Sequence, residues 1–379
     1  MLFNVLFEHQ VKSLANFVDS IEKSMIDQIG AEEFLKKAHS AVVIDVRSPG
    51  EYSQGHIPGA VNIPLFDNEE RAMVGILYKN SGREAAVLKG LDLAGPKMAG
   101  YVKALNEISR SKEVLVHCWR GGMRSENMSW LFSQAGYHVF VLEGGYKTFR
   151  RYIRSCFEQN ARLFVLGGLT GSGKTEILHA LGNNHEQFID LEQIACHKGS
   201  VFGAFGQKPQ PTTEQFENDL FTAWSGFDLT KPIWIEDESR AIGNVNIPDP
   251  LFEQMNHPAI MVQIECSREA RVRRLVKEYS QFEKEDLKEA ILKIRDKLGD
   301  RVKTACLALD AGGFNAVAEI VLDYYDKTYE HSISRRKGLD CHKIPILTDD
   351  PGATAQVILG YISSLQISSN NFPHATDLS

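Results

Sequence analysis

The segment that most constrains the fold begins with an apolar run at residues 162–167 and continues as Gly-Leu-Thr-Gly-Ser-Gly-Lys-Thr at residues 168–175. Helix-forming residues follow at 176–181. A strand, a glycine-rich turn and a helix in this order let several backbone N–H groups face one anion at the start of the helix. The pattern therefore predicts an α/β domain with a phosphate-binding loop whose threonine hydroxyl suits Mg²⁺. The residues expected at this site are Gly168, Gly171, Gly173, Lys174 and Thr175.

Polar side chains follow two further apolar runs in the same half of the chain, at residues 187–189 and 232–235. Because the carboxyl ends of parallel strands meet at one edge of a sheet, we expect these side chains near the phosphate-binding loop. The acidic pair after residue 235 would face the metal; the alternative is that this pair belongs to a solvated acidic turn. The histidine at position 197 could equally be an ordinary loop residue. The candidates are Asp190, Glu192, His197, Glu236 and Asp237.

A cysteine loop follows another apolar run, at residues 114–116. Cys118 lies where this strand would end, two glycines follow at positions 121 and 122, and a helical pattern begins at Ser125. The glycines allow backbone N–H groups to point inward, and Arg120 and Arg124 favour the ionised thiol, which is the nucleophilic form. The loop is therefore predicted to activate Cys118 and to bind an anion; a structural buried cysteine is the alternative reading.

Composition excludes several classes of function. The 379 residues suffice for two domains, and 43% apolar with 24% charged residues is ordinary for a globular protein. The six cysteines are scattered without a Cys-x-x-Cys pair, so we expect neither a zinc site nor a disulfide framework. The net charge of −7 argues against non-specific coating of nucleic acid. No run suits a membrane span or a signal peptide, so we expect no membrane partner and a cytoplasmic location.

Strands that alternate with helices predict parallel sheets with helices on both faces. The expected organisation is a helical N-terminal extension at 1–29, an α/β domain at 30–155 and a second α/β domain with the phosphate-binding loop at 156–267. Beyond it, residues 268–365 are expected to form a helical lid or nucleic-acid-binding region that ends in a strand and a helix at 343–365, and residues 366–379 a disordered tail.

Basic side chains cluster on two predicted helices. Such clusters are usually solvated helix faces. In a chain with net negative charge, however, they also suggest a track for a polyanion. The residues are Lys147, Arg150, Arg151 and Arg154 on the helix that joins the domains, and Arg271 and Arg274 on the first helix after residue 267.

The first α/β domain resembles the rhodanese family. The resemblance rests on Asp45-Val-Arg47, on His-Ile-Pro-Gly-Ala at residues 56–60, on the cysteine loop and on Glu-Gly-Gly-Tyr at residues 143–146. It implies that Cys118 carries a transferable sulfur or selenium atom. The spacing Cys-x5-Arg, from Cys118 to Arg124, is that of rhodanese-like phosphatases and leaves room for a tetrahedral anion.

The second α/β domain, with its phosphate-binding loop, is P-loop NTPase-like. Together with the rhodanese-like domain, it resembles the bacterial tRNA 2-selenouridine synthase family. The order of motifs carries this resemblance, including Asp-Leu-Glu at 190–192, His-Lys-Gly-Ser-Val-Phe-Gly at 197–203 and Glu-Asp-Glu-Ser-Arg at 236–240. It implies an enzyme that acts on the wobble 2-thiouridine of tRNAs for Lys, Glu and Gln. The sulfur is first alkylated by geranyl diphosphate and then replaced by selenium from selenophosphate. Cys118 would attack the selenium and hold it as a selanyl sulfide, while Arg120 and Arg124 hold the phosphate.

Three questions stay open from the sequence. The phosphate-binding loop could hold geranyl diphosphate with Mg²⁺, which we favour, or a nucleotide such as ATP or GTP. The chain could be a phosphatase that uses Cys118 and Arg124, with Glu143 as a weak candidate for its general acid. It could also be a sulfurtransferase, or a non-enzymatic adaptor whose rhodanese-like domain docks a sulfur-relay partner. The enzyme that produces selenophosphate is a further candidate partner.

Overall fold

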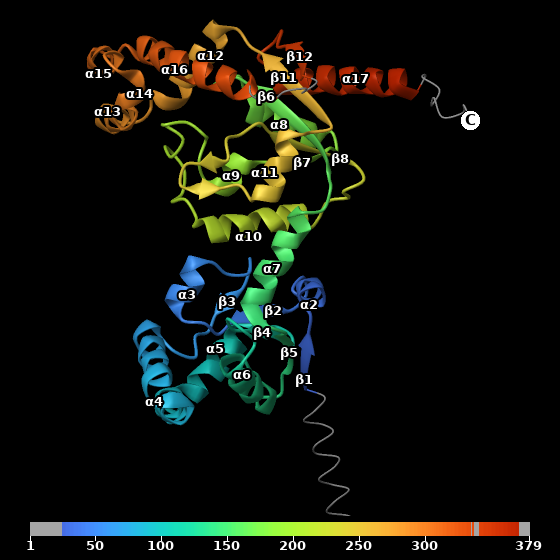
Figure 1. The fold of residues 1–379 in the computed structure, drawn as a ribbon, viewed down its shortest axis with the longest axis vertical. Coiled ribbons are helices and arrows are strands. Elements are labelled where there is room, and N and C mark those ends of the chain that lie inside the picture. Colours follow the sequence, from blue (N-terminus) through green and yellow to red (C-terminus); the bar gives the residue numbers. More distant parts are fainter. Residues whose placement is uncertain (1–24, 335, 337–340, 371–379) are drawn as a thin grey trace, which may run out of the picture. The chain divides into compact units, whose positions relative to one another are not determined.

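The computed structural model describes residues 25–334, 336 and 341–370. The chain forms two compact units, residues 1–156 and 157–379, drawn in blue to green and in green to red in Figure 1. Each unit contains its own five-stranded sheet, and every strand in these two sheets pairs in parallel. The α/β class expected from the sequence is confirmed for both.

The sheet of the first unit has the order β1-β5-β4-β2-β3. Its strands are β1 (Ile26–Ile29), β2 (Val42–Asp45), β3 (Val61–Asn62), β4 (Glu113–His117) and β5 (His138–Leu142). The central strand β4 is buried along four of its five residues, as expected for an apolar run with helices on both sides. Cys118 therefore follows the middle of the sheet, at the carboxyl edge where α/β folds place functional loops.

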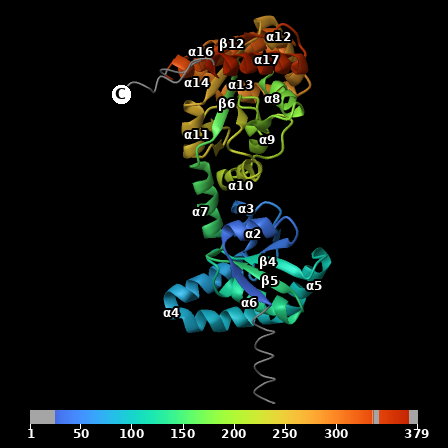
Figure 2. The same ribbon diagram turned by 90° about the vertical axis from the view of Figure 1, so that its right-hand side faces the viewer.

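Helices cover both faces of this sheet. The helix α2 (Ala31–Lys37) lies on the opposite side from α6 (Met123–Gln134), as Figure 2 shows. Phe34 of α2 contacts the His117 ring, whereas Met128 and Phe132 of α6 join the core on the other face. The remaining helices are α3 (Pro49–Gln54), α4 (Asn68–Ala94), the 3₁₀ turn η1 (Gly95–Lys97), α5 (Met98–Ile108) and α7 (Gly145–Phe157).

The sheet of the second unit has the order β12-β11-β6-β8-β7. Its strands are β6 (Arg162–Gly168), β7 (Gln187–Ile189), β8 (Pro232–Glu236), β11 (Ile260–Glu265) and β12 (Cys341–Pro345). The phosphate-binding loop follows the central strand β6 and leads into α8 (Lys174–Asn183). A core of β6, α8 and α17 (Pro351–Asn370) side chains covers one face. A small hairpin, β9 (Ala241–Ile242) and β10 (Val245–Asn246), follows β8.

A group of helices after β11 has its own apolar core, to which Phe202 contributes. These helices are α12 (Arg268–Tyr279), α13 (Lys284–Lys293), α14 (Arg295–Leu298), α15 (Arg301–Asp310) and α16 (Phe314–Ser334). The remaining helices of the unit are α9 (Leu191–Ala195), α10 (Thr213–Trp224) and α11 (Asp249–Asn256). The helical region predicted beyond residue 267 is therefore present.

Two boundaries predicted from the sequence are wrong. Residues 26–29 are not part of a helical extension: they form β1, which pairs with β5 and completes the first sheet. The strand and the helix expected at 343–365 are present: β12 pairs with β11 in the second sheet, and α17 follows it. The helix α17 continues to Asn370, so the tail begins later than residue 366. Residues 1–24 and 371–379 lie outside the described residues. Within the described part of the chain, no helix is long and apolar enough to cross a bilayer.

Candidate functional site

The cysteine loop holds Cys118 close to a hydroxyl group. The Cys118 side chain is buried, and its Sγ lies 3.2 Å from Oγ of Ser125, in the first turn of α6. The same hydroxyl donates to the Gly122 carbonyl at 2.9 Å. Rotation of the hydroxyl would let it donate to a thiolate. Ser125 was not among the residues singled out from the sequence, although it directly follows the Cys-x5-Arg spacing.

The loop is held by the Glu-Gly-Gly-Tyr turn through backbone hydrogen bonds and through the ring of Tyr146, whose centre lies 5.7 Å from that of Trp119. The N–H of Tyr146 donates to the Cys118 carbonyl at 2.8 Å, and that of Lys147 to the Trp119 carbonyl at 3.0 Å. A Cβ at Gly145 would lie 2.4 Å from the Cys118 carbonyl oxygen, and the φ of Gly145 is +62°. Only glycine allows both this conformation and this close approach. The motif therefore positions the loop.

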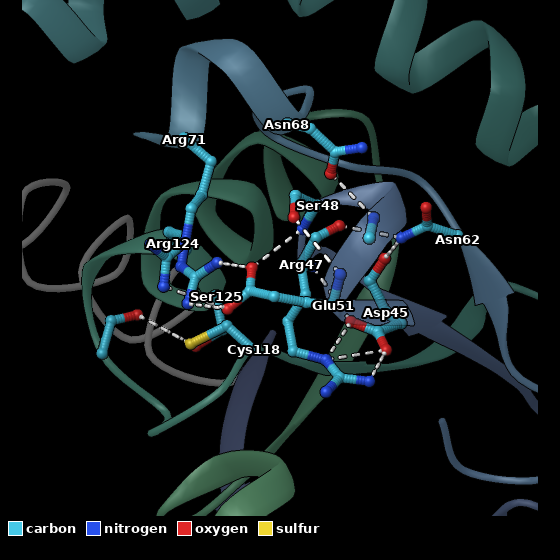
Figure 3. Close-up of polar contacts among 12 residues, drawn as sticks. Asp45, Arg47, Ser48, Glu51, Asn62, Asn68, Arg71, Cys118, Arg124 and Ser125 are labelled. Atoms are coloured by element: carbon cyan, nitrogen blue, oxygen red, sulfur yellow. Dashed lines mark hydrogen bonds and ion pairs between the residues drawn. The ribbon is translucent and has the colours of Figure 1, made fainter. Parts of the chain in front are cut away.

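An acidic residue that sequence reasoning missed faces the loop arginine. Glu51 accepts from Arg124 Nη1 at 2.7 Å and also pairs with Arg71 at 3.6 Å (Figure 3). Glu51 is fixed because it forms a capping box with Ser48 at the start of α3. Burial raises the pKa of Glu51, but hydrogen bonding and charge from Arg124 outweigh it and leave the pKa below its ordinary value. Glu51 therefore competes with any anion for Arg124.

The Asp45-Val-Arg47 motif forms a buried ion pair beside the loop, where the Arg47 guanidinium lies 5.9 Å from the centre of the Trp119 ring. Arg47 donates to both carboxylate oxygens of Asp45 and to the Gly55 carbonyl, and its guanidinium lies 3.8 Å from the centre of the Tyr146 ring. Burial lowers the pKa of the adjacent His117 to about 4, so its ring is neutral at pH 7. These residues hold the strand ends together; Figure 3 shows Asp45 and Arg47 facing each other.

The phosphate-binding loop has the conformation expected from its glycines. Gly171 and Gly173 have φ values of +77° and +85°, and Lys174 donates to the Gly168 carbonyl at 3.2 Å. The N–H of Gly168 donates to the hydroxyl of Tyr329 at 3.0 Å. This N–H is thus engaged by α16, and Gly168 serves the loop by its small size, since a Cβ there would lie 2.6 Å from Ile264.

Three carboxylates gather beside the hydroxyl of Thr175. One oxygen each of Glu192, Glu236 and Glu238 lies within 4.8 Å of the other two. The Thr175 hydroxyl donates to Glu192 at 3.2 Å and to Glu236 at 3.4 Å. Oxygen ligands of this kind suit Mg²⁺. Glu238 was missed from the sequence, although it is the third acid of the same Glu-Asp-Glu run.

The protonation of these groups fits a cation site. Burial and the Glu238 charge raise the pKa of Glu192 to about 8, and burial with the charge of Glu192 raises that of Glu236 well above its ordinary value. Burial also raises the pKa of Glu238. Burial disfavours the charged form of Lys174, but the surrounding carboxylates outweigh it and raise its pKa. The donor set therefore fits a divalent cation, which would remove the cost of three neighbouring negative charges.

The other three candidates predicted for this edge of the sheet have different roles. Asp190 caps α9 through the N–H of Gln193 and accepts from His179 at 2.6 Å, so it is not directed to the cation site. Asp237 pairs with Arg336 at 2.7 Å. His197 lines the cavity above the loop, and its Nδ1 is buried without a partner among the described residues. Of the five candidates, Glu192 and Glu236 are the ones next to Thr175.

Three of the six basic residues predicted to contact RNA are engaged in the fold. Arg271 is buried, pairs with Asp326 and donates to the Thr170 carbonyl at 2.8 Å. Arg274 donates to the Ser172 carbonyl at 2.6 Å and pairs with Asp349. Both arginines thus support the phosphate-binding loop from α12. Arg150 is buried, so it is not part of a surface track. The exposed residues of this set are Lys147, Arg151 and Arg154.

A cavity of about 1670 Å³ lies over the phosphate-binding loop. Lys174, Thr175, Glu192 and Glu238 line it, and so do residues 197–201. Tyr324, Tyr325, Lys293 and Lys297 come from the helical group. Its size exceeds that of ordinary small-molecule sites, which measure about 300–1,000 Å³. The cavity can therefore hold a diphosphate and part of a larger substrate.

The chain is similar to known proteins in both units. The family described as "tRNA 2-selenouridine synthase AAA domain" matches residues 161–343, and the rhodanese-like domain family matches residues 30–152. A "tRNA 2-selenouridine synthase" of Sulfurovum sp. is 34% identical over 77% of this chain and 89% of its own length. One of Hydrogenovibrio crunogenus is 32% identical over 78% of this chain and 90% of its own. One of Nitrosomonas europaea is 37% identical, and the match spans 58% of each chain.

Proposed function

Because this chain belongs to the tRNA 2-selenouridine synthase family, we propose that it replaces the sulfur of 2-thiouridine in tRNA by selenium. The observation that carries this proposal is the presence of two different anion sites in one chain, the cysteine loop and the phosphate-binding loop with its carboxylates. Each suits one of two successive reactions. The substrates are the wobble nucleosides of tRNAs for Lys, Glu and Gln, which are cytoplasmic molecules.

In the first reaction, the phosphate-binding loop holds geranyl diphosphate. The sulfur of 2-thiouridine attacks the geranyl carbon that bears the diphosphate, the bond between this carbon and the diphosphate oxygen breaks, and diphosphate leaves. Lys174 and the loop N–H groups bind the leaving diphosphate, whose charge increases as the bond breaks. Mg²⁺, held by Thr175, Glu192, Glu236 and Glu238, would supply further positive charge there. Alkylation turns the sulfur into a good leaving group.

In the second reaction, the cysteine loop holds selenophosphate, a tetrahedral anion, through Arg120, Arg124 and backbone N–H groups. The Cys118 thiolate attacks the phosphorus atom, a sulfur–phosphorus bond forms, and the selenium–phosphorus bond breaks to release hydrogen selenide. Hydrogen selenide attacks the carbon that bears the S-geranyl group, and geranylthiol leaves with a proton. Water then hydrolyses the cysteinyl phosphate to phosphate and restores the thiol.

Attack on phosphorus needs no oxidant or reductant. If the thiolate instead attacked selenium and kept it as a selanyl sulfide, the phosphorus would leave in the reduced form, as phosphite. The spacing Cys-x5-Arg and the Ser125 hydroxyl 3.2 Å from Sγ suit a sulfur atom that first bonds to phosphorus and later leaves it. We therefore assign the phosphoryl group to Cys118, in place of the selenium that the family resemblance suggests.

Nucleoside mass analysis of tRNA incubated with geranyl diphosphate and selenophosphate tests the proposal. Wild-type protein should form S-geranyl-2-thiouridine and then 2-selenouridine. Cys118→Ala should stop at the S-geranyl nucleoside, whereas Cys156→Ala, which removes another buried cysteine of the same unit, should form both. Phosphorus NMR should detect phosphate as the product. Selenation by Cys118→Ala at the wild-type rate would contradict a catalytic role of the cysteine, and phosphite would contradict attack on phosphorus.

A further inference from the structure

A second cavity, of about 270 Å³, lies in the first unit among α4, α5 and α6. Its walls are almost entirely apolar. The buried part is formed by Phe66, Ala86, Tyr101 and Met128, and the exposed edge by Leu91 and Trp130. Large apolar side chains exposed around a buried floor are a feature of ligand sites. Exposure of such side chains to water is unfavourable, and a bound ligand would cover them.

The shape of this cavity depends on a bend in α4. The helix is interrupted at Gly82, whose φ of +85° and ψ of −177° are accessible in practice only to glycine. Val74 and Tyr78 line the cavity from the segment before the bend, and Val87 and Leu91 from the segment after it. The bend thus directs both segments of one helix toward the same space. Figure 1 shows α4, α5 and α6 together.

The cavity adjoins the cysteine loop. Met123 and Arg124, which begin α6 and end the loop, are among the residues that line it. The next residue, Ser125, contacts Sγ of Cys118 at 3.2 Å. A ligand whose apolar part fills the cavity would therefore have its polar end next to the selenium-transfer site.

The volume limits the size of the ligand. A cavity of about 150 Å³ with apolar walls accommodates a ring of six carbons, so about 250 Å³ suits ten carbons by proportion. The cavity of about 270 Å³ therefore matches a ten-carbon chain. A nucleobase with its several hydrogen-bonding groups would find almost no polar partner on these walls.

We propose that this cavity binds the geranyl chain of S-geranyl-2-thiouridine while selenium replaces the sulfur. The inference rests on the proposed function and adds a second hydrocarbon site, in a different unit from the phosphate-binding loop. It assigns α4–α6 to recognition of the group that leaves. Geranyl diphosphate carries the same ten-carbon group and could also bind in this cavity. The experiment distinguishes these two ligands.

The test compares two short anticodon stem-loop RNAs, one with S-geranyl-2-thiouridine and one with S-methyl-2-thiouridine, as substrates for selenation. Val87→Trp fills the cavity and should raise KM for the S-geranyl RNA by about tenfold or more, since lost contact with two methylene groups already corresponds to that factor. Turnover of the S-methyl RNA should stay unchanged. Leu91→Gln should give a smaller rise in the same direction, and it leaves the fold intact because Leu91 is 60% exposed.

Leu88→Gln is the matched control, because Leu88 lies on the same helix, is 59% exposed and does not line the cavity. It should alter neither reaction. Equal effects of Val87→Trp on both RNAs would overturn the inference. The inference would also be overturned if Val87→Trp lost geranylation and geranyl diphosphate binding but still selenated the S-geranyl RNA. If wild-type protein selenates neither RNA, the proposed function itself fails, which is a separate result.

Discussion

Arg124 forms an ion pair with Glu51 and is also proposed to bind the anion in the cysteine loop, so Glu51 and the anion compete for it. The Arg124–Glu51 pair is about one-fifth exposed. Glu51→Gln should raise the affinity of the loop for inorganic phosphate by about fivefold, since a partly exposed ion pair is worth about 1 kcal/mol. Calorimetric titration with phosphate checks this. An unchanged affinity would mean that Glu51 and the anion do not compete.

The variant Lys174→Ala distinguishes the two ligands considered for the phosphate-binding loop. Loss of its charge-assisted hydrogen bonds in Lys174→Ala should weaken the true ligand by about 1.5–3 kcal/mol, or about ten- to a hundredfold. If the ligand is geranyl diphosphate, geranylation should fall without any nucleotide present, and tRNA that already carries the S-geranyl group should still be selenated. Titration of geranyl diphosphate into both proteins is the measurement. Equal affinities would exclude the diphosphate and favour a nucleotide.

At the scale of elements, the bend of α4 is a local feature with a measurable energy. Gly82→Ala should destabilise the protein by about 1–3 kcal/mol, because the conformation is strained for any other residue although the space around it is open. Gly75→Ala is the matched control on the same helix and should be stabilising by up to about 1 kcal/mol. Denaturant unfolding of both variants checks the pair. A neutral Gly82→Ala would show that the bend is not fixed by this residue.

The exposed basic residues of α7 give a second prediction at this scale. Lys147→Gln, Arg151→Gln and Arg154→Gln change exposed side chains and avoid the buried Arg150. If α7 contacts RNA phosphates, each change should reduce the slope of log K against log salt by about 0.7–0.9. Binding of tRNA measured across a salt series provides the slope. The same slope in all three variants would locate the RNA elsewhere.

Regular elements could largely be predicted, because periodicity and glycine placement are local. The strand before each functional loop and the helices α12 to α16 follow from such patterns. The strand β1 could not be predicted, since Ile26-Asp-Gln-Ile29 has no continuous apolar run and is a strand only by pairing with β5. The contact of Arg124 with Glu51 joins residues 73 positions apart, and no local pattern encodes it. Likewise, the cationic side chains of Arg271 and Arg274 suggested RNA, whereas tertiary contacts direct them to the phosphate-binding loop.

For the whole molecule, the carboxylate cluster predicts how stability depends on pH. The pKa of Glu192 is about 8 in the folded state and near 4.5 when unfolded, so the folded protein binds the proton more tightly. This contribution is fully present below pH 4.5 and is lost as pH rises through 8. Without divalent cations, the melting temperature should therefore fall between pH 6 and pH 8 more in wild type than in Glu192→Gln.

Addition of Mg²⁺ should reverse this trend, because a cation that binds only the folded state stabilises it by mass action and displaces the protons. Thermal unfolding at both pH values, with and without Mg²⁺, provides the comparison. If Mg²⁺ has the same effect on Glu192→Gln as on wild type, Glu192 is not one of its ligands.

The backbone contacts between the Glu-Gly-Gly-Tyr turn and the cysteine loop have a mechanical consequence. The helix α7 begins within this turn, at Gly145, and the N–H groups of its next two residues hold the carbonyls of Cys118 and Trp119. No side chain separates the two segments at Gly145, so a shift of one segment breaks these hydrogen bonds unless the other follows. A displacement of the first turn of α7 therefore acts on the cysteine loop through these hydrogen bonds, and Arg151 and Arg154 lie about one and two turns further along the same helix.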